Sequence, residues 1–188
     1  MLFVSVLLFS CSVQNEAVEY KDRRMAVITN AEDINWTVAK DHKLFIPDKS
    51  DFAKVDFVLE KALLAGEFKF LENQTLKGVK NRYRQYVFYL DDNADKVVFV
   101  NSFCEIPLRH ANGNDEEFNW RNNILDVSDG GKCYWHMKIN LTAGTYSRVA
   151  TNGYGFIYKK QPAYYYLPQI AYIWNYEDWI AIRKNIGI

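Results

Sequence analysis

The sequence has no surplus of charge of either sign, because its 188 residues include 23 Lys and Arg against 23 Asp and Glu. Proteins that bind nucleic acid need a basic face to contact the phosphates. Attraction to an anionic membrane surface likewise needs a polybasic patch. The balanced charge therefore argues against a nucleic-acid partner and against electrostatic binding to a membrane surface.

The motifs of common metal and catalytic sites are also missing. The sequence contains no C-x-x-C and no H-x-x-x-H, which are spacings typical of metal-binding pairs. The polar loop Asn112–Glu117 offers oxygen atoms for calcium, but it lacks the calcium-loop pattern that closes with a Glu. Asp129–Gly131 leads into a predicted strand, whereas the glycines of a phosphate-binding loop lead into a helix. We therefore expect no cofactor, no metal site and no catalytic constellation.

One catalytic alternative stays open, a hydrolase that uses Cys133 or His136. Such a site would need a nucleophile such as Cys133 beside His136, with an acid such as Asp129 to orient the base. In a strand, however, positions 133 and 136 point to opposite faces. Only the fold could supply another base, and the remaining histidines are His42 and His110.

The apolar segment at the start, Leu2–Phe9, is far shorter than the roughly 20 residues that a membrane-spanning helix needs. It ends in Leu8-Phe9-Ser10-Cys11, and polar residues follow at once. This pattern resembles the lipobox of a bacterial lipoprotein signal, although no Lys or Arg precedes it. The resemblance implies a signal peptide over 1–10, acyl chains such as palmitate on Cys11, and a membrane anchor in the bacterial cell envelope. The alternative is a buried N-terminal strand of a cytosolic protein.

The sequence has few cysteines, and two of the three, Cys104 and Cys133, are left once Cys11 is assigned to lipid. An even pair in an oxidising envelope favours a disulfide. Cys104 ends one predicted strand and Cys133 begins another, so antiparallel pairing would bring their Cα atoms to the roughly 4.4–6.8 Å that a disulfide needs. Such a bond would contribute about 3–4 kcal/mol. The alternative is two small buried apolar side chains.

One helix is predicted to begin at Pro47–Asp51, where Ser50 or Asp48 can cap the free N–H groups of the first turn. Gly66 is the expected C-terminal cap. Apolar residues recur with a period of about 3.6 and form one face that packs on a sheet, namely Phe52, Val55, Leu59, Ala62 and Leu63.

Four strands are predicted after the helix. Tyr83–Leu90 and Lys96–Phe103 are rich in aromatic and β-branched residues, and the acidic turn 91–95 joins them as a hairpin. Lys132–Leu141 alternates between apolar and polar residues, and Thr145–Thr151 follows as its partner. Residues 109–117 are expected to be a polar loop.

These elements predict an α+β fold, with one main helix packed on an antiparallel four-stranded meander and an aromatic-rich C-terminal extension. The expected organisation is a lipoprotein-type signal over 1–10, a tether over 11–30, the α+β domain over 31–155 and the extension over 156–188.

Several short signatures together resemble a group of small uncharacterised bacterial lipoproteins and secreted proteins. They are Arg82-x-x-Gln85-Tyr86, Val100–Cys104, Trp120, Val127–Tyr134 with its Asp-Gly-Gly, and Asn152–Tyr154 with its Asn-Gly. The resemblance covers roughly residues 45–155. It implies a helix paired with an antiparallel meander and an envelope or secreted location, and it implies no activity. Chains of this group end soon after the Asn-Gly turn, whereas this chain continues.

Aromatic residues make up 16% of the chain and crowd together near its C-terminus, at Tyr164, Tyr165, Trp174 and Trp179 among others. They either cover an open face or edge of the sheet, or form an exposed platform for a glycan or a protein partner. With the expected anchor and no catalytic pattern, we expect a non-catalytic envelope lipoprotein with a binding or accessory role, which is to dock a protein partner or a glycan or to inhibit another protein. A purely structural envelope component is the remaining alternative.

Overall fold

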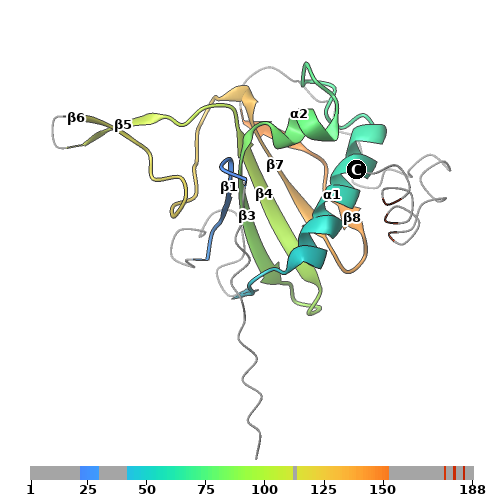
Figure 1. The fold of residues 1–188 in the computed structure, drawn as a ribbon. Coiled ribbons are helices and arrows are strands. Elements are labelled where there is room, and N and C mark those ends of the chain that lie inside the picture. Colours follow the sequence, from blue (N-terminus) through green and yellow to red (C-terminus); the bar gives the residue numbers. More distant parts are fainter. Residues whose placement is uncertain are drawn as a thin grey trace, which may run out of the picture.

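The computed structural model describes residues 22–29, 42–111 and 114–152, together with three helical residues near the C-terminus, Tyr176, Ile180 and Lys184. Its centre is a mixed sheet of seven strands in the order β1-β3-β4-β7-β8, in which β2 also pairs with β3 and β9 with β7 (Figure 1). The strands of this sheet are β1 Met25–Val27, β2 Lys43–Leu44, β3 Tyr83–Leu90, β4 Lys96–Phe103, β7 Gly131–Asn140, β8 Thr145–Tyr146 and β9 Ala150–Asn152. Two helices, α1 Lys49–Leu64 and α2 Leu76–Lys80, and a separate pair of strands, β5 Leu108–Ala111 and β6 Asn114–Glu117, complete the described elements.

The helix predicted after Pro47 is confirmed as α1. Asp48 is its N-cap, because its side chain accepts the N–H of Asp51 at 2.9 Å while the Asp51 side chain accepts the N–H of Asp48 at 3.1 Å. At the other end Gly66 has a φ of +78°, which a residue with a side chain adopts only at a cost. The N–H groups of Gly66 and Glu67 donate to the carbonyls of Leu63 and Ala62, which closes the helix in a Schellman motif.

The expected four-stranded meander under one helix is wrong. The three long strands do pair antiparallel in the order β3-β4-β7, but the sheet is mixed, because β1 lies parallel to β3. Met25–Val27 belongs to the stretch that was expected to be a tether. The predicted strand 145–151 is also split into β8 and β9, which pair with opposite ends of β7. Strands of two or three residues are too short to show an alternating pattern, so pairing with the long strands determines them.

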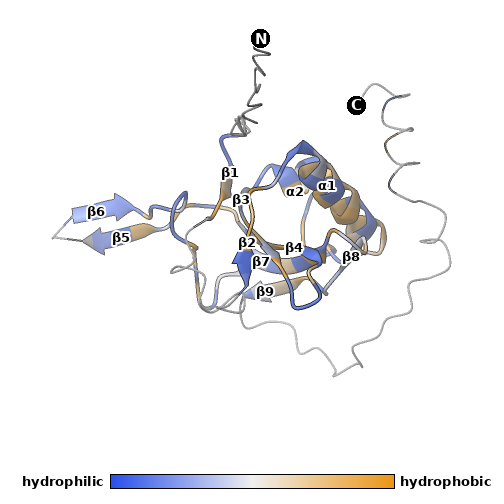
Figure 2. Ribbon diagram, turned by 90° about the horizontal axis from the view of Figure 1, so that it is seen from below, coloured by the Kyte–Doolittle hydropathy of each residue, from blue (hydrophilic) through white to orange (hydrophobic). Residues whose placement is uncertain are grey.

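Both faces of the sheet are covered, whereas one covered face was expected. On the first face α1 and α2 lie side by side over the strands (Figure 2), and their apolar residues pack with a core that includes Tyr86, Val98 and Trp135. On the second face Val87 and Phe99 pack with Trp120 and other residues of the connection between β6 and β7. Burial on both faces accounts for the nearly continuous apolar sequences of β3 and β4.

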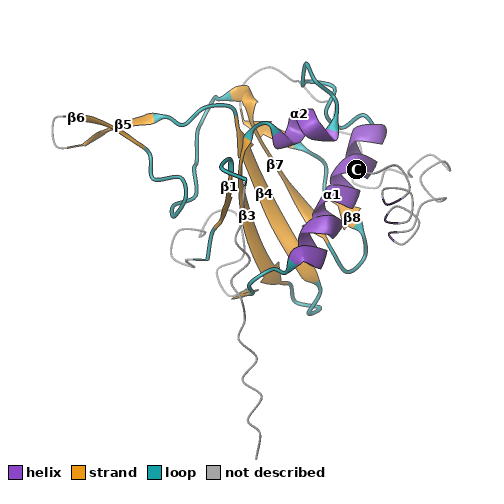
Figure 3. Cartoon of the chain, viewed as in Figure 1, coloured by secondary structure: helices purple, strands orange, loops and turns teal. Residues whose placement is uncertain are grey.

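The predicted polar loop 109–117 is also wrong, because it contains the antiparallel hairpin β5–β6. This hairpin stands away from the body of the protein, and two loops lead to it and from it (Figure 3). The described residues of β6 are exposed along its whole length. No apolar alternation marks these strands, so their sequence is indistinguishable from that of a polar loop.

Candidate functional site

Between β4 and β7 the chain leaves the sheet, forms the hairpin β5–β6 and returns across the second face. We call residues 108–117 the projecting hairpin and residues 118–127 the return segment. Cross-strand pairs in the hairpin set Arg109 opposite Glu116 and His110 opposite Asp115. His110 Nδ1 lies 2.9 Å from Asp115 Oδ1. The side chain of Leu108 is 66% exposed at the start of the hairpin, so the element presents both charged and apolar surface to solvent.

The projecting hairpin would not be stable by itself. An isolated two-stranded hairpin is at best marginally stable in water, and exposed ion pairs add little. Its strands pair with each other and with no other strand among the described residues. Its base is closed by a hydrogen bond from the N–H of Phe118 to the carbonyl of Pro107 at 3.0 Å. Its position therefore depends on how the chain is fixed on either side of it.

The incoming side is fixed by a disulfide between Cys104 and Cys133, whose Cα atoms lie 5.3 Å apart. The pairing of β4 with β7 explains this closeness. Ser102 lies opposite Trp135, and the same antiparallel register, continued past the ends of the two strands, sets Cys104 opposite Cys133. The N–H of Cys104 also lies 3.3 Å from the Cys133 sulfur. The disulfide thus joins the end of β4, where the chain departs, to the beginning of β7.

The outgoing side is fixed by two buried amide side chains, Gln85 on β3 and Asn101 on β4, which lie opposite each other. We call them the amide clamp. Gln85 Nε2 donates to the carbonyls of Trp120 at 2.5 Å and Asn123 at 2.7 Å. Gln85 Oε1 accepts the N–H of Leu125 at 2.8 Å and the Asn101 amide at 3.0 Å. Asn101 Nδ2 also donates to the Leu125 carbonyl at 2.8 Å. The clamp therefore pairs the buried backbone of the return segment with the sheet.

Two further side chains fasten the return segment to the edges of the sheet. The guanidinium of Arg121 stacks 4.4 Å from the centre of the Trp120 ring and donates to the carbonyl of Arg23 at 2.5 Å. Asn152 Nδ2 on β9 donates to the carbonyl of Val127 at 3.0 Å. The return segment is thus held at its middle by the amide clamp and near its ends by contacts with β9 and with the residues preceding β1.

The candidate catalytic residues do not form a nucleophile–base pair. The sulfur of Cys133 is bonded to Cys104. His136 is half-buried, its Nδ1 lies 3.2 Å from Asn152 Oδ1, and burial lowers the pKa of its imidazole below the usual 6.5. Asp129 has a φ of +63° in the turn before β7, and the acidic residue whose charge acts on His136 is Asp126. The His136 side chain is therefore engaged with Asn152 of β9 and not with a nucleophile.

A turn at Ser128 and Asp129 precedes β7. A Cβ atom added to Gly130 would lie 2.0 Å from Cδ2 of Tyr134, so the Tyr134 ring packs directly on the backbone of Gly130. Gly131 has a φ of +57°. The register between β7 and β9 also shifts between Gly131 and Trp135. The two glycines therefore serve close packing and the irregular start of β7.

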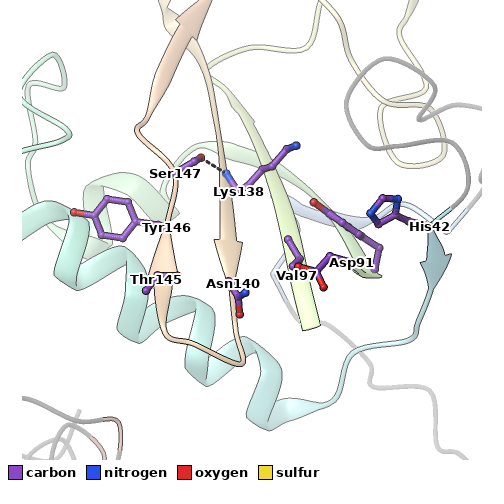
Figure 4. Close-up of a pocket in the computed structure, with 9 residues that line it drawn as sticks. His42, Asp91, Val97, Lys138, Asn140, Thr145, Tyr146 and Ser147 are labelled. Atoms are coloured by element: carbon purple, nitrogen blue, oxygen red, sulfur yellow. Dashed lines mark hydrogen bonds between the residues drawn. The ribbon is translucent and has the colours of Figure 1, made fainter. Parts of the chain in front are cut away.

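A shallow hollow of about 440 Å³ lies at the other end of the sheet (Figure 4). It is lined by His42, Tyr89, Asp91, Val97, Lys138, Asn140, Thr145, Tyr146 and Ser147. Much of its polar lining serves the neighbouring turns: Asp91 Oδ1 accepts the N–H groups of Asn93 and Asp95, and Asn140 Nδ2 donates to Asp95. The Tyr146 ring points away from His42 and Asp91. Asp91 and Asn140 are thus already engaged in the turns at this end of the sheet.

Several predicted site residues lie outside the described residues, namely Cys11, Tyr164, Tyr165, Trp174 and Trp179. Tyr176, from the same aromatic region, packs edge-on against Phe57 of α1 at 5.9 Å between ring centres. Tyr176 and Ile180 both pack against the core on the helix-covered face.

The described residues contain no group of three or more His, Cys, Asp or Glu side chains arranged to hold a metal ion. Within the same ranges no helix is long and apolar enough to cross a membrane.

In comparisons with known proteins, no protein-family model, no curated protein and no solved structure matches the chain.

Proposed function

We propose that this protein is a non-catalytic lipoprotein of the bacterial cell envelope that binds a partner protein through its projecting hairpin. The observation that carries the proposal is the anchoring of this hairpin. Its incoming side is fixed by a disulfide and its outgoing side by a buried pair of amides, although none of its described residues belongs to either core. A rigid scaffold that holds out an exposed element is the usual arrangement of a recognition loop.

The treatment of strand edges supports the same function. The large sheet ends in the short strands β1 and β2 on one side and β8 and β9 on the other, which limits unwanted pairing with other chains. The projecting hairpin has no such protection among the described residues. Its open edges suit the addition of an extended segment from a partner, in which backbone hydrogen bonds supply affinity and side chains supply selectivity. The basic side chains of β5 and the acidic side chains of β6 would give the two edges different preferences.

The proposed location rests on the sequence around Cys11. Acyl chains on Cys11 would hold the protein to a membrane of the envelope, and more than one chain makes such attachment stable. An oxidising compartment outside the cytoplasm is also where a disulfide such as Cys104–Cys133 persists. A glycan bound by the C-terminal aromatic residues is the second partner class that the composition allows.

Site-specific photo-crosslinking from native envelope membranes tests the proposed partner. A photoreactive residue at Glu116 on β6 is expected to give a discrete crosslinked product, and the same residue at exposed Gln74 serves as the control. Replacing residues 108–117 by a short Gly-Ser linker is expected to abolish binding to that partner while leaving the sheet folded. A partner retained by the linker variant, or crosslinking only from Gln74, would overturn the role of the hairpin.

The hydrolase and the structural alternative each predict something that distinguishes them from a binding protein. A Cys133 nucleophile would need a free thiolate, which the disulfide with Cys104 does not provide. A purely structural component would give a membrane-integrity defect on deletion, and that defect would be rescued by the linker variant. If the protein instead binds a partner through its hairpin, as we propose, the linker variant would not rescue the effect of the deletion.

A further inference from the structure

We propose that the Cys104–Cys133 disulfide is a redox-controlled latch on the projecting hairpin. Reduction releases the incoming side of the hairpin, while the sheet and the return segment keep their places. As a means of regulation this inference rests on the proposed binding role of the hairpin. The release of the hairpin on reduction does not depend on that role.

The two sides of the hairpin are anchored by different chemistry. The incoming residues 104–107 are tied by the disulfide, and Ile106 is only partly buried against the second-face core. The outgoing return segment is tied by the amide clamp, and its residues Trp120 and Leu125 are buried in that core. A reductant acts on the first anchor and leaves the second unchanged. Loss of the disulfide is therefore expected to loosen one side of the hairpin and not both.

The disulfide lies where a reductant can reach it. Cys104 is exposed and Cys133 is partly buried. A thiolate of a small dithiol attacks Cys104 Sγ, and Cys133 Sγ leaves as a thiolate that takes up a proton. The second thiol of the reductant then resolves the mixed disulfide and releases the Cys104 thiol. The dithiol is oxidised to its own disulfide, so two electrons and two protons pass to the protein.

The body of the protein has contacts that hold the start of β7 without the disulfide. The guanidinium of Arg82 donates to the carbonyl of Cys133, and also to that of Lys132 at 3.3 Å. Six residue pairs join β4 to β7 up to Ser102 and Trp135, both of which are fully buried. The disulfide therefore lies just beyond an already paired strand end, where its loss removes a constraint on the hairpin and leaves the sheet intact.

Hydrogen exchange of the whole chain, with and without dithiothreitol, tests the latch. On reduction the amides of residues 105, 106, 108–111 and 114–118 are expected to exchange about tenfold faster or more. Those of 85–89 and 98–102 should speed up only as far as the loss of the disulfide lowers the free energy of global unfolding, which urea unfolding of the reduced protein measures. A variant carrying both Cys104→Ser and Cys133→Ser should match the reduced protein and should not respond to dithiothreitol. This double variant controls for effects of the reductant that do not involve the disulfide.

Two results would overturn the latch. Unchanged exchange at 105, 106, 108–111 and 114–118 after complete reduction would show that the disulfide does not hold the hairpin. Exchange at 85–89 and 98–102 with an opening free energy below that of global unfolding would show that the disulfide supports the whole domain. If the double variant does not fold, reduction of the folded wild-type protein still decides between these results. Photo-crosslinking at Glu116 tests the binding role independently, so a failed latch and a failed binding role are distinguishable.

Discussion

Replacing Gln85 by Met tests whether the amide clamp holds the return segment on the sheet. Met has nearly the length of Gln and adapts its shape to irregular gaps, but it offers no amide donor or acceptor. The substitution would leave the carbonyl of Trp120 and the N–H of Leu125 without their buried partner. Each buried unpaired group costs about 1–3 kcal/mol, so we expect the free energy of unfolding to fall by about 2–6 kcal/mol.

Unfolding in urea, followed by tryptophan fluorescence, measures this loss. The matched control is Gln74→Met, because Gln74 is exposed and the expected change there lies within about 0.5 kcal/mol. The dependence of the free energy on urea concentration should be the same in both variants, so that a lower midpoint reports stability alone. A loss below about 1 kcal/mol in Gln85→Met would refute the reasoning, because packing without hydrogen bonds would then suffice.

Hydrogen exchange of the same variant locates the damage. The amide of Leu125 donates to Gln85 Oε1, so its protection is expected to fall first. The amides of α1 lie on the opposite face of the sheet and should lose protection only to the extent that global stability falls. Equal loss of protection at Leu125 and throughout α1 would mean that the return segment and the sheet unfold as one unit.

Two further predictions concern the start of β7 and its histidine. Gly130→Ala should destabilise the protein by about 1–3 kcal/mol through the clash with the Tyr134 ring. In Gly131→Ala the added Cβ meets no atom within 4 Å, so the only cost is the strained backbone at φ +57°. Equal losses of unfolding free energy for the two variants in urea would contradict the predicted clash at Gly130. Burial lowers the pKa of His136 below 6.5, so the unfolded chain takes up its proton first as the pH falls, and stability is lost below pH 6.5. His136→Gln should flatten that loss in urea titrations down to about pH 5, and an unchanged pH profile would show that His136 does not cause it.

The helix and the long strands could be predicted because local chemistry determines them. The side chain of Asp48 and the flexible backbone of Gly66 mark the ends of α1 without reference to any other part of the fold. The hairpin β3–β4 is equally local, because an Asx-rich turn separates two strongly apolar strands. The expected closeness of Cys104 and Cys133 needed one step beyond local chemistry, the antiparallel pairing of β4 with β7.

The remaining parts of the fold depend on contacts between distant segments. Strand β1 exists because Met25–Val27 pairs with the open edge of β3, far along the chain. The amide clamp was missed for a related reason. The sequence places Gln85 and Asn101 within two short signatures, and polar residues such as these inside two otherwise apolar strands indicate a buried polar contact. The pattern shows that they need partners, but only the fold supplies the return segment as that partner.

The division between the anchors and the hairpin bears on what determines the sequence of residues 108–117. None of the described residues in this range belongs to either core, and the anchoring groups all lie outside it. The fold therefore places little constraint on the hairpin side chains beyond compatibility with a strand. An opposed arrangement of basic residues on β5 and acidic residues on β6 contributes little stability at exposed positions. The charged side chains of the hairpin are better explained by contact with a partner than by folding. The hairpin is accordingly the first place to search for that contact.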